Sequence, residues 1–340
     1  MDFFAPITIP SLPEPIRYGQ KILLTGSCFT EHIGDRLQEL KFEVLQNPNG
    51  ILFDPQSVCD SLCSYISPRK YTVADLVCFN ELWQSWQHHS RFSDLDAETA
   101  VTRINQSQQQ AHDFLKNADW LIVTLGSSFS YRLTDQGAPL GVKDRVEGGV
   151  ANCHRAPGAW FRKHLMTVEE ILSSLDTCLH QLFQFNPKLQ VLFTISPVRH
   201  LRDGVIENNR SKARLIETVH HLVNKFERIH YFPAYELVVD VLRDYRFYDI
   251  DLAHPNYAAT RFVMEHFMQH CIEEKSRSIA EQVNQIVIAR KHKAFQPASK
   301  AHQQFLQQFA QRTQMLMVEY PELNLKGEFD YFTGAGSTNS

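Results

Sequence analysis

The stretch KILLTGSCFTEHIGDRLQEL, residues 21–40, is the most informative part of the sequence about the fold. Its first part, Lys21 to Gly26, is a short apolar run that ends in glycine, which is typical of a buried parallel strand. Apolar residues then recur at positions 33, 37 and 40, which is helical spacing. The sequence therefore predicts a strand, a tight turn at Gly26-Ser27-Cys28 and a helix, in that order.

Strand-like and helix-like patterns alternate along the rest of the chain. Four more apolar runs have the length of strands: residues 42–46, 119–126, 189–195 and 230–232. Helices are expected between them, and one of these begins at Thr167 with a capping-box pattern. This alternation is typical of βαβ crossovers, so we expect an α/β fold with a mostly parallel sheet.

We expect the sheet-forming domain to cover residues 1–275. It contains one insertion at about 54–117, expected to be mostly helical or irregular, and a second at 134–160 that is rich in turn residues. Residues 276–330 carry helical patterns without strand signals, which predicts a helical C-terminal extension split near Gln296-Pro297. The tail, residues 331–340, is expected to be disordered.

Composition and charge argue against several classes of protein. The 340 residues carry a formal net charge of −4, which does not suit a dedicated nucleic-acid binder. No apolar run approaches the roughly 18 residues of a membrane span, and the proline-rich N-terminus lacks the basic start of a signal peptide. Seven cysteines, an odd number without zinc-type spacing, are expected to be reduced thiols. We therefore expect a cytoplasmic protein without metal or cofactor.

The turn at Gly26-Ser27-Cys28 is the first candidate for chemistry. Ligands of an open parallel sheet bind beyond the carboxyl ends of the strands, and this turn lies there, at the start of a helix. Free backbone N–H groups and the helix dipole favour negative charge at such a point, so we expect a lowered pKa for the thiol of Cys28. Taken alone, however, small residues at a tight turn are better explained by the turn itself.

Asp251-Leu252-Ala253-His254 is the second candidate, placed between the last expected strand and a helix. The three-residue spacing lets one backbone turn aim both side chains at a common point. The carboxylate of Asp251 would then orient the imidazole of His254 as a general base. Because an Asp three residues before a His also arises by chance, the placement carries more weight than the spacing.

The segment from Ile22 to Thr30 resembles the signature of the GSCFA family, with Thr30 where the alanine of that name usually stands. The resemblance continues in consistent order over most of the chain, at residues 47–50, 83–93, 124–126, 152–154, 196–200 and 251–255. This family is placed in the SGNH, or GDSL-like, esterase superfamily. The resemblance implies a three-layer α/β/α, flavodoxin-like sheet and esterase chemistry.

The superfamily pattern implies that Asp251 and His254 belong to a catalytic triad whose nucleophile lies in the first turn. Strict alignment of Gly-Asp-Ser puts Ser27 on the aspartate and Cys28 on the serine. Either Cys28 is a thiol nucleophile, or Ser27 acts through a one-residue shift of the turn. We favour Cys28 slightly, because the turn fixes its distance from Gly26. A serine would need general base activation, whereas a cysteine can form a thiolate–imidazolium pair.

The same pattern implies an oxyanion hole made by the first turn, a glycine after the second strand and an asparagine after the third. Gly50 corresponds to that glycine and would donate its N–H. The third strand is followed by Gly126-Ser127-Ser128, without an asparagine. Ser127, or Asn152 from the second insertion, would therefore have to replace it.

Three candidate substrate contacts lie in the insertions. Trp86 and His89 belong to an aromatic stretch that suits a sugar-stacking wall, although a surface hairpin with buried tryptophans would have the same composition. His154 follows Asn152 and Cys153. A metal site is not expected there, because Cys153 and His154 alone supply too few ligands.

Two more candidates, Arg199 and His200, follow the fourth strand and should lie at the same sheet edge as the turn. Arg199 would bind a substrate carboxylate or phosphate, or would pair with a structural acid such as Asp203.

From these residues we expect a hydrolase that removes a small acyl group, such as acetyl, from a small-molecule or carbohydrate-like ester. One alternative is a non-catalytic module that keeps the cleft and binds a glycan or another ligand. The other alternative is acyl transfer by the same residues. The sequence does not indicate an oligomeric state.

Overall fold

The computed structural model describes residues 5–137 and 149–335. Part of the expected 134–160 insertion and the end of the expected tail lie outside the described residues. The chain divides into two compact units. The first consists of residues 1–10, 21–34 and 45–265, and the second of residues 11–20, 35–44 and 266–340.

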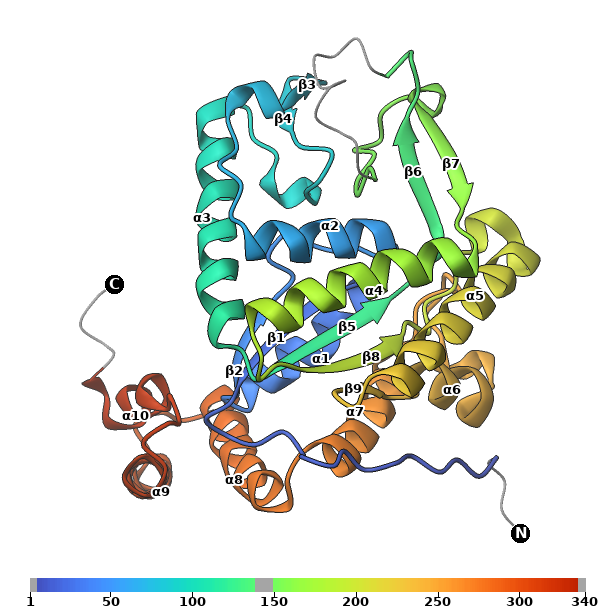
Figure 1. Ribbon diagram of the computed structural model, residues 1–340. Coiled ribbons are helices and arrows are strands. Elements are labelled where there is room, and N and C mark those ends of the chain that lie inside the picture. The colour runs from blue at the N-terminus through green and yellow to red at the C-terminus, as the bar shows by residue number, and fades with distance from the viewer. Residues whose placement is uncertain (1–4, 138–148, 336–340) are drawn as a thin grey trace. The chain divides into compact units, whose positions relative to one another are not determined.

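The first unit is organised around a parallel sheet of five strands (Figure 1). Across the sheet the strands are β2 (Glu43–Gln46), β1 (Lys21–Gly26), β5 (Trp120–Leu125), β8 (Gln190–Ile195) and β9 (Ile229–Tyr231). This order is second, first, third, fourth and fifth in the chain, which is the doubly wound order of flavodoxin-like folds. The predicted α/β fold is confirmed, and all five strands lie where apolar runs were expected.

Helices alternate with these strands because their apolar stripes match the buried side chains of the sheet. They are α1 (Cys28–Glu39), α2 (Pro55–Ile66), α3 (Ala97–Asn117), α4 (Val168–Phe185), α5 (Gly204–Lys225), α6 (Ala234–Glu236) and α7 (Tyr257–Cys271). One apolar core joins α2, α3, α4 and α5 to the sheet side chains Leu121, Val123 and Phe193. The capping box expected at Thr167 is present at the start of α4.

The strand ends are aligned at the carboxyl edge of the sheet. Gly26 pairs in register with Thr124, and Thr124 pairs with Thr194. Gly26 has a φ of +142°, and a Cβ there would lie 2.2 Å from the carbonyl oxygen of Thr124. Only glycine lets β1 turn this close to β5. The turns after β1, β5 and β8 therefore emerge at one edge, as the parallel sheet requires.

Short hairpins lie in and beside the two insertions. β3 (Val77–Phe79) pairs antiparallel with β4 (Leu82–Gln84), inside a region that was expected to be mostly helical or irregular. β6 (Phe129–Leu133) pairs antiparallel with β7 (Phe161–Leu165). Strands of three residues carry too little periodicity to be recognised in a sequence, which explains why β3 and β4 were not predicted.

The second unit is mainly helical in its described part. It contains α8 (Glu274–Lys291), α9 (Lys300–Glu319) and α10 (Lys326–Thr333), and the first two are separated around Gln296-Pro297 as expected. The expectation of disorder from residue 331 onward is wrong at its start. Helix α10 continues through Thr333 and buries Phe332 in the apolar cluster of this unit. Over the described residues, no helix has both the length and the apolar character needed to cross a membrane.

Candidate active site

The turn after β1 is held by the strands on both sides of it. The N–H of Gly26 donates to Oδ1 of Asn47 (3.0 Å), and the N–H of Ser27 donates to the carbonyl oxygen of Thr124 (3.0 Å). Cys28 follows as the first residue of α1. The predicted strand–turn–helix is therefore confirmed, with Cys28 at a helix N-terminus.

The two candidate nucleophiles differ in exposure. Ser27 is only 4% exposed, and its buried Oγ has no hydrogen-bond partner among the described residues. Cys28 is partly exposed. An ester carbonyl must come within bonding distance of the nucleophile, so exposure favours Cys28 over Ser27.

The thiol of Cys28 does not have the lowered pKa that was expected at a helix N-terminus. Burial raises its pKa, and the negative charge of Glu31 raises it further. The backbone N–H groups of Phe29 and Cys28 and the positive charge of Lys212 lower it by less. The expectation was wrong because desolvation of the thiolate raises the pKa more than the N–H groups at the helix start lower it. The thiol is protonated at neutral pH, so its reaction needs a base.

Asp251 and His254 form a hydrogen-bonded pair on the loop before α7. Nδ1 of His254 donates to Oδ2 of Asp251 (2.6 Å). Oδ1 of Asp251 accepts the N–H groups of Ala253 (2.9 Å) and His254 (3.0 Å). These backbone donors, followed by the imidazole, hold the pKa of Asp251 far below its usual range. The carboxylate thus keeps the proton of a neutral His254 on Nδ1 and leaves Nε2 as the acceptor.

The loop that carries this pair is tied to the carboxyl end of β8. The N–H of Arg199 donates to the carbonyl oxygen of Ala253 (3.1 Å), and the N–H of Asp249 donates to that of His254 (2.8 Å). His254 therefore lies at the same sheet edge as the turn after β1. Within residues 5–137 and 149–335, no hydrogen bond joins it to Ser27 or Cys28. Catalytic hydrogen bonds are often long in a free enzyme and tighten in the substrate complex.

Two of the three expected oxyanion donors already have partners. The N–H of Gly50 donates to the carbonyl oxygen of Asn47 (2.7 Å). Oγ of Ser127 accepts the N–H of Phe129 (3.1 Å) and lies 3.2 Å from Oγ of Ser211. Either group would have to share or release these hydrogen bonds in order to contact an oxyanion.

Asn49, to which the sequence assigned no role, carries a free amide donor in the same loop as Gly50. Its Oδ1 accepts hydrogen bonds from the hydroxyl of Tyr65 (3.0 Å) and from Nε2 of Gln108 (3.1 Å). These two donors fix the orientation of the side-chain amide, and its Nδ2 has no partner in the described part of the chain. The asparagine of NPNG was visible in the sequence, but the two residues that orient it come from α2 and α3.

The structure brings several residues of the two insertions together. The N–H groups of Ala151 and Asn152 donate to the carbonyl oxygen of Trp86 (2.8 and 3.2 Å), and Nε2 of His154 donates to that of Ser85 (2.7 Å). Trp86 is 2% exposed within an apolar cluster, so its expected role as a sugar-stacking wall is wrong. Its ring has no free face to offer a substrate, and the hairpin interpretation fits instead.

Asn152 and His89 occupy different places in this group. Oδ1 of Asn152 accepts the N–H of His154 (2.9 Å), which turns the segment back toward Trp86. His89 packs on Gly50, where an added Cβ would lie 2.1 Å from that of His89, and its N–H donates to the carbonyl oxygen of Asn49 (2.9 Å). His89 is thus the member of the group in contact with the loop after β2.

Arg199 and His200 are placed beside β8, as expected. The guanidinium of Arg199 lies 5.4 Å from the centre of the Tyr248 ring, whereas Asp203 pairs with Lys163, so the alternative Arg199–Asp203 ion pair is wrong. The ring of His200 packs against Phe53 at 5.7 Å. Burial lowers the pKa of His200 to about 4, so this histidine is neutral at physiological pH.

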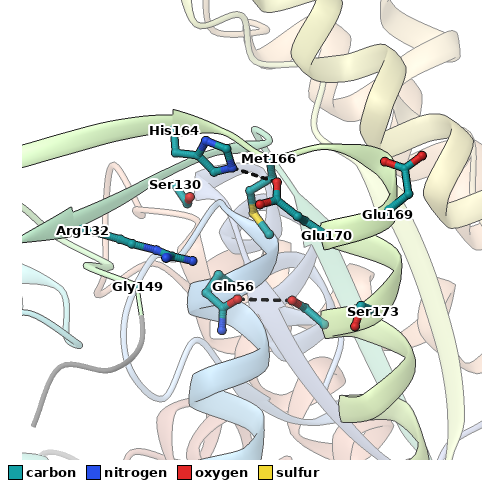
Figure 2. Close-up of a pocket in the computed structure, with 10 residues that line it drawn as sticks. Gln56, Ser130, Arg132, Gly149, His164, Met166, Glu169, Glu170 and Ser173 are labelled. Carbon is teal, nitrogen blue, oxygen red and sulfur yellow. Dashed lines mark hydrogen bonds and ion pairs between the residues drawn. The ribbon is translucent and has the colours of Figure 1, made fainter.

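A cavity of about 400 Å³, lined mostly by residues with polar side chains, lies between β6, α2 and α4 (Figure 2). Its walls carry hydrogen bonds between Nε2 of His164 and Oε2 of Glu170 (2.8 Å) and between Oγ of Ser174 and Oε1 of Gln56 (3.2 Å). Figure 2 shows Arg132 on the opposite side from α4. None of the residues that line this cavity belongs to the predicted catalytic set.

Two family models match the sequence. The model of the GSCFA family covers residues 21–267, which includes the whole parallel sheet and the loop of Asp251 and His254. The chain belongs to the GSCFA family. The model of the GSCFA domain protein, C-terminal domain, covers residues 283–334 and so includes the second half of α8 and all of α9 and α10. The resemblance seen in the first turn therefore extends over both parts of this GSCFA protein.

Solved structures similar to this GSCFA protein include a protein described as a GDSL-like lipase from Parabacteroides merdae. The two are 13% identical, with 75% of this chain and 97% of that chain covered and a TM-score of 0.38. A carbohydrate esterase of family 3 from Talaromyces cellulolyticus is 8% identical, with 78% and 99% covered and a TM-score of 0.34. An acetyl xylan esterase from Butyrivibrio proteoclasticus is 12% identical, with 75% and 64% covered and a TM-score of 0.36. No curated protein matches the sequence.

Proposed function

We propose that this GSCFA protein hydrolyses esters, with Cys28 as nucleophile and His254, oriented by Asp251, as acid and base. The observation that carries the proposal is the 2.6 Å hydrogen bond between His254 and Asp251 at the sheet edge where Cys28 begins α1. A carboxylate that fixes an imidazole is the acid–base part of acyl-transfer enzymes, and a cysteine at a helix N-terminus is a suitable nucleophile for it.

The raised thiol pKa determines the order of the proposed steps. Because Cys28 is protonated, Nε2 of His254 takes the thiol proton as Sγ attacks the ester carbonyl. The imidazolium, held by Asp251, then gives this proton to the departing alkoxide, which leaves as an alcohol and a thioester on Cys28. Water attacks the thioester, losing its proton to His254, and the acid product leaves as Cys28 recovers a proton.

The proposed oxyanion hole combines backbone and side-chain donors. Free N–H groups at the start of α1 are available to the developing charge. We add Nδ2 of Asn49, because Tyr65 and Gln108 hold its amide oxygen and leave its nitrogen unpartnered. Asn49 takes the part that sequence reasoning gave to Ser127 or Asn152, and Gly50 contributes only if its N–H leaves the carbonyl of Asn47.

The proposed substrate is a small acyl ester, such as acetyl on a carbohydrate-like alcohol. Arg199, His200, His154 and His89 are the candidate contacts for the alcohol part, since each combines partial exposure with a polar group. The same residues would serve acyl transfer if a second alcohol replaced water. Comparison of products formed with and without sugar acceptors distinguishes hydrolysis from transfer.

The test is turnover of p-nitrophenyl acetate by alanine variants of Ser27, Cys28 and His254. C28A and H254A are expected to lose activity, whereas the matched control C78A, which removes an exposed thiol from β3, is expected to keep it. If all three site variants turn over substrate at the wild-type rate, the proposed site is wrong.

A non-catalytic binding module is the rival function, favoured by the protonated thiol and by the lack of a hydrogen bond between Cys28 and His254. A fluorophosphonate acylates an activated serine, and iodoacetamide alkylates a reactive thiol. A folded protein that resists both reagents and does not turn over p-nitrophenyl acetate would be a binding module.

A further inference from the structure

Lys212 is buried beneath the candidate site although it carries an amine. It lies on α5 and is 1% exposed. Its Nζ donates to the carbonyl oxygens of Gly126 and Ser196, each at 2.5 Å. These carbonyls belong to the first residues after β5 and β8, so one amine joins the carboxyl ends of two adjacent strands.

No carboxylate neutralises this amine within the described residues, where its partners are the two carbonyl oxygens and the ring of Tyr235, whose centre lies 5.9 Å from Nζ. An ammonium has three N–H donors, and two are used. A buried charge without an ion-pair partner is costly, and burial lowers the pKa of Lys212 to about 7. The structure thus keeps, beneath the candidate site, an amine whose charged form is stabilised by a nearby negative charge.

The charged or titratable groups around Lys212 and Cys28 are few. Cys28 is the group whose negative charge raises the pKa of Lys212, and Lys212 in turn lowers the pKa of Cys28. His200, on the loop after β8, is kept neutral by burial and by Lys212. Glu31, one turn along α1 from Cys28, acts in the opposite direction on the thiol. The contacts place Lys212 next to the same turn: its Nζ donates to the carbonyl oxygen of Gly126, and a Cβ on Gly126 would lie 3.3 Å from the Cβ of Ser27, the residue before Cys28.

We propose that Lys212 is a positioning residue of this site: it holds the ends of β5 and β8 and supplies the positive charge that stabilises a thiolate at Cys28. The inference rests on the proposed function for the use of that thiolate. The stabilisation of the Cys28 thiolate by the charge of Lys212 does not depend on any substrate. When the S–H bond of Cys28 breaks, the proton goes to His254 or to water, and the thiolate is balanced by the protonated Nζ of Lys212.

The test measures thiolate formation directly, without an ester. Wild type, K212Q, K212M and the control K225M are alkylated with iodoacetamide near pH 6, below the pKa of about 7 of Lys212, and mass spectrometry follows Cys28 relative to Cys78. Lys225 is on the same helix but pairs at the surface with Asp176, so K225M should leave the ratio unchanged. In K212Q and K212M we expect Cys28 alkylation to slow about tenfold relative to Cys78.

K212Q separates charge from structure, because its neutral amide can still donate hydrogen bonds. Thermal unfolding verifies that each variant is folded, and E31Q should change the ratio in the other direction by speeding Cys28 alkylation. K212R, which restores a cation, should return the ratio to within about twofold of wild type. A folded K212Q or K212M with the wild-type ratio would overturn the proposal. Failure of the proposed function appears separately, as an inactive enzyme whose Cys28 alkylation still depends on Lys212.

Discussion

Nδ1 of His254 lies 2.6 Å from Oδ2 of Asp251, and the other oxygen of the same carboxylate accepts two backbone N–H groups from the intervening turn. The pair is therefore assembled by four consecutive residues. Its geometry depends on local hydrogen bonds and on the tie between Arg199 and Ala253, and not on packing in the core.

Substitution of either member of this pair should affect catalysis more than stability. H254A should lower kcat for p-nitrophenyl acetate by about 10²- to 10⁴-fold, since it removes the proposed acid and base. D251N should lower kcat by a similar order because it no longer selects the His254 tautomer. The side chains are 49% and 47% exposed, so thermal unfolding should change little for H254A. A midpoint far below wild type together with unchanged kcat would contradict this assignment.

Asn49 gives a prediction about the oxyanion hole. N49D keeps an oxygen for Tyr65 and Gln108 but replaces the proposed N–H donor. We expect kcat to fall by about 10²- to 10³-fold with a smaller change in KM, because the donor acts mainly on the transition state. Steady-state kinetics, with circular dichroism to verify the fold, make the measurement. If folded N49D had the kcat of wild type, Asn49 would not contact the oxyanion.

The buried amine of Lys212 should make stability depend on pH. The pKa of Lys212 is about 7 in the folded chain, whereas its ordinary value is 10.5. Between these values the unfolded chain binds more protons than the folded one, so the free energy of unfolding rises with pH. Below about pH 7 both states are protonated and the contribution is constant. Above about pH 10.5 both are neutral.

Urea unfolding of wild type and K212M at several pH values measures this contribution. The free energy of unfolding of wild type, minus that of K212M, should rise by about 1 kcal/mol for each pH unit between pH 7 and 10. A difference between the two proteins that stays constant over this range would show that folding does not lower the pKa of Lys212.

Gly26 gives a prediction about the turn itself. A Cβ at this position would lie 2.2 Å from the carbonyl oxygen of Thr124, at a φ that side chains rarely adopt. G26A should therefore lower the free energy of unfolding by about 2–3 kcal/mol. The control is G158A, where no atom lies within 4 Å of an added Cβ. Equal urea midpoints for the two variants would mean that the turn tolerates a side chain.

The parallel sheet was predictable because its strands are continuous apolar runs that end in small residues. Lys21–Gly26 and the run before Gly126 show this clearly, and their ends directed attention to the edge of the sheet where the candidate turn lies. Asp251 and His254 were predictable for a related reason, since a three-residue spacing on one loop needs no knowledge of distant contacts.

The rest depends on contacts between residues far apart in the chain. The helix start at Cys28 was visible in the sequence, but its burial was not, and burial decides the direction of the thiol pKa. The stretch around Trp86 has the same composition whether this tryptophan is buried or lines a sugar site. Lys212 stands in a polar stretch that resembles an ordinary exposed helix start, and only the fold places its amine on Gly126 and Ser196.

Trapping of the acyl intermediate tests the central claim most directly. The protein is quenched with acid during turnover of p-nitrophenyl acetate, and fragmentation mass spectrometry locates the acetyl group. Acetyl is expected on Cys28, where neutral hydroxylamine should remove it as a thioester, and it should be missing from C28A. Acetyl on Ser27, or full turnover by C28A, would contradict the claim.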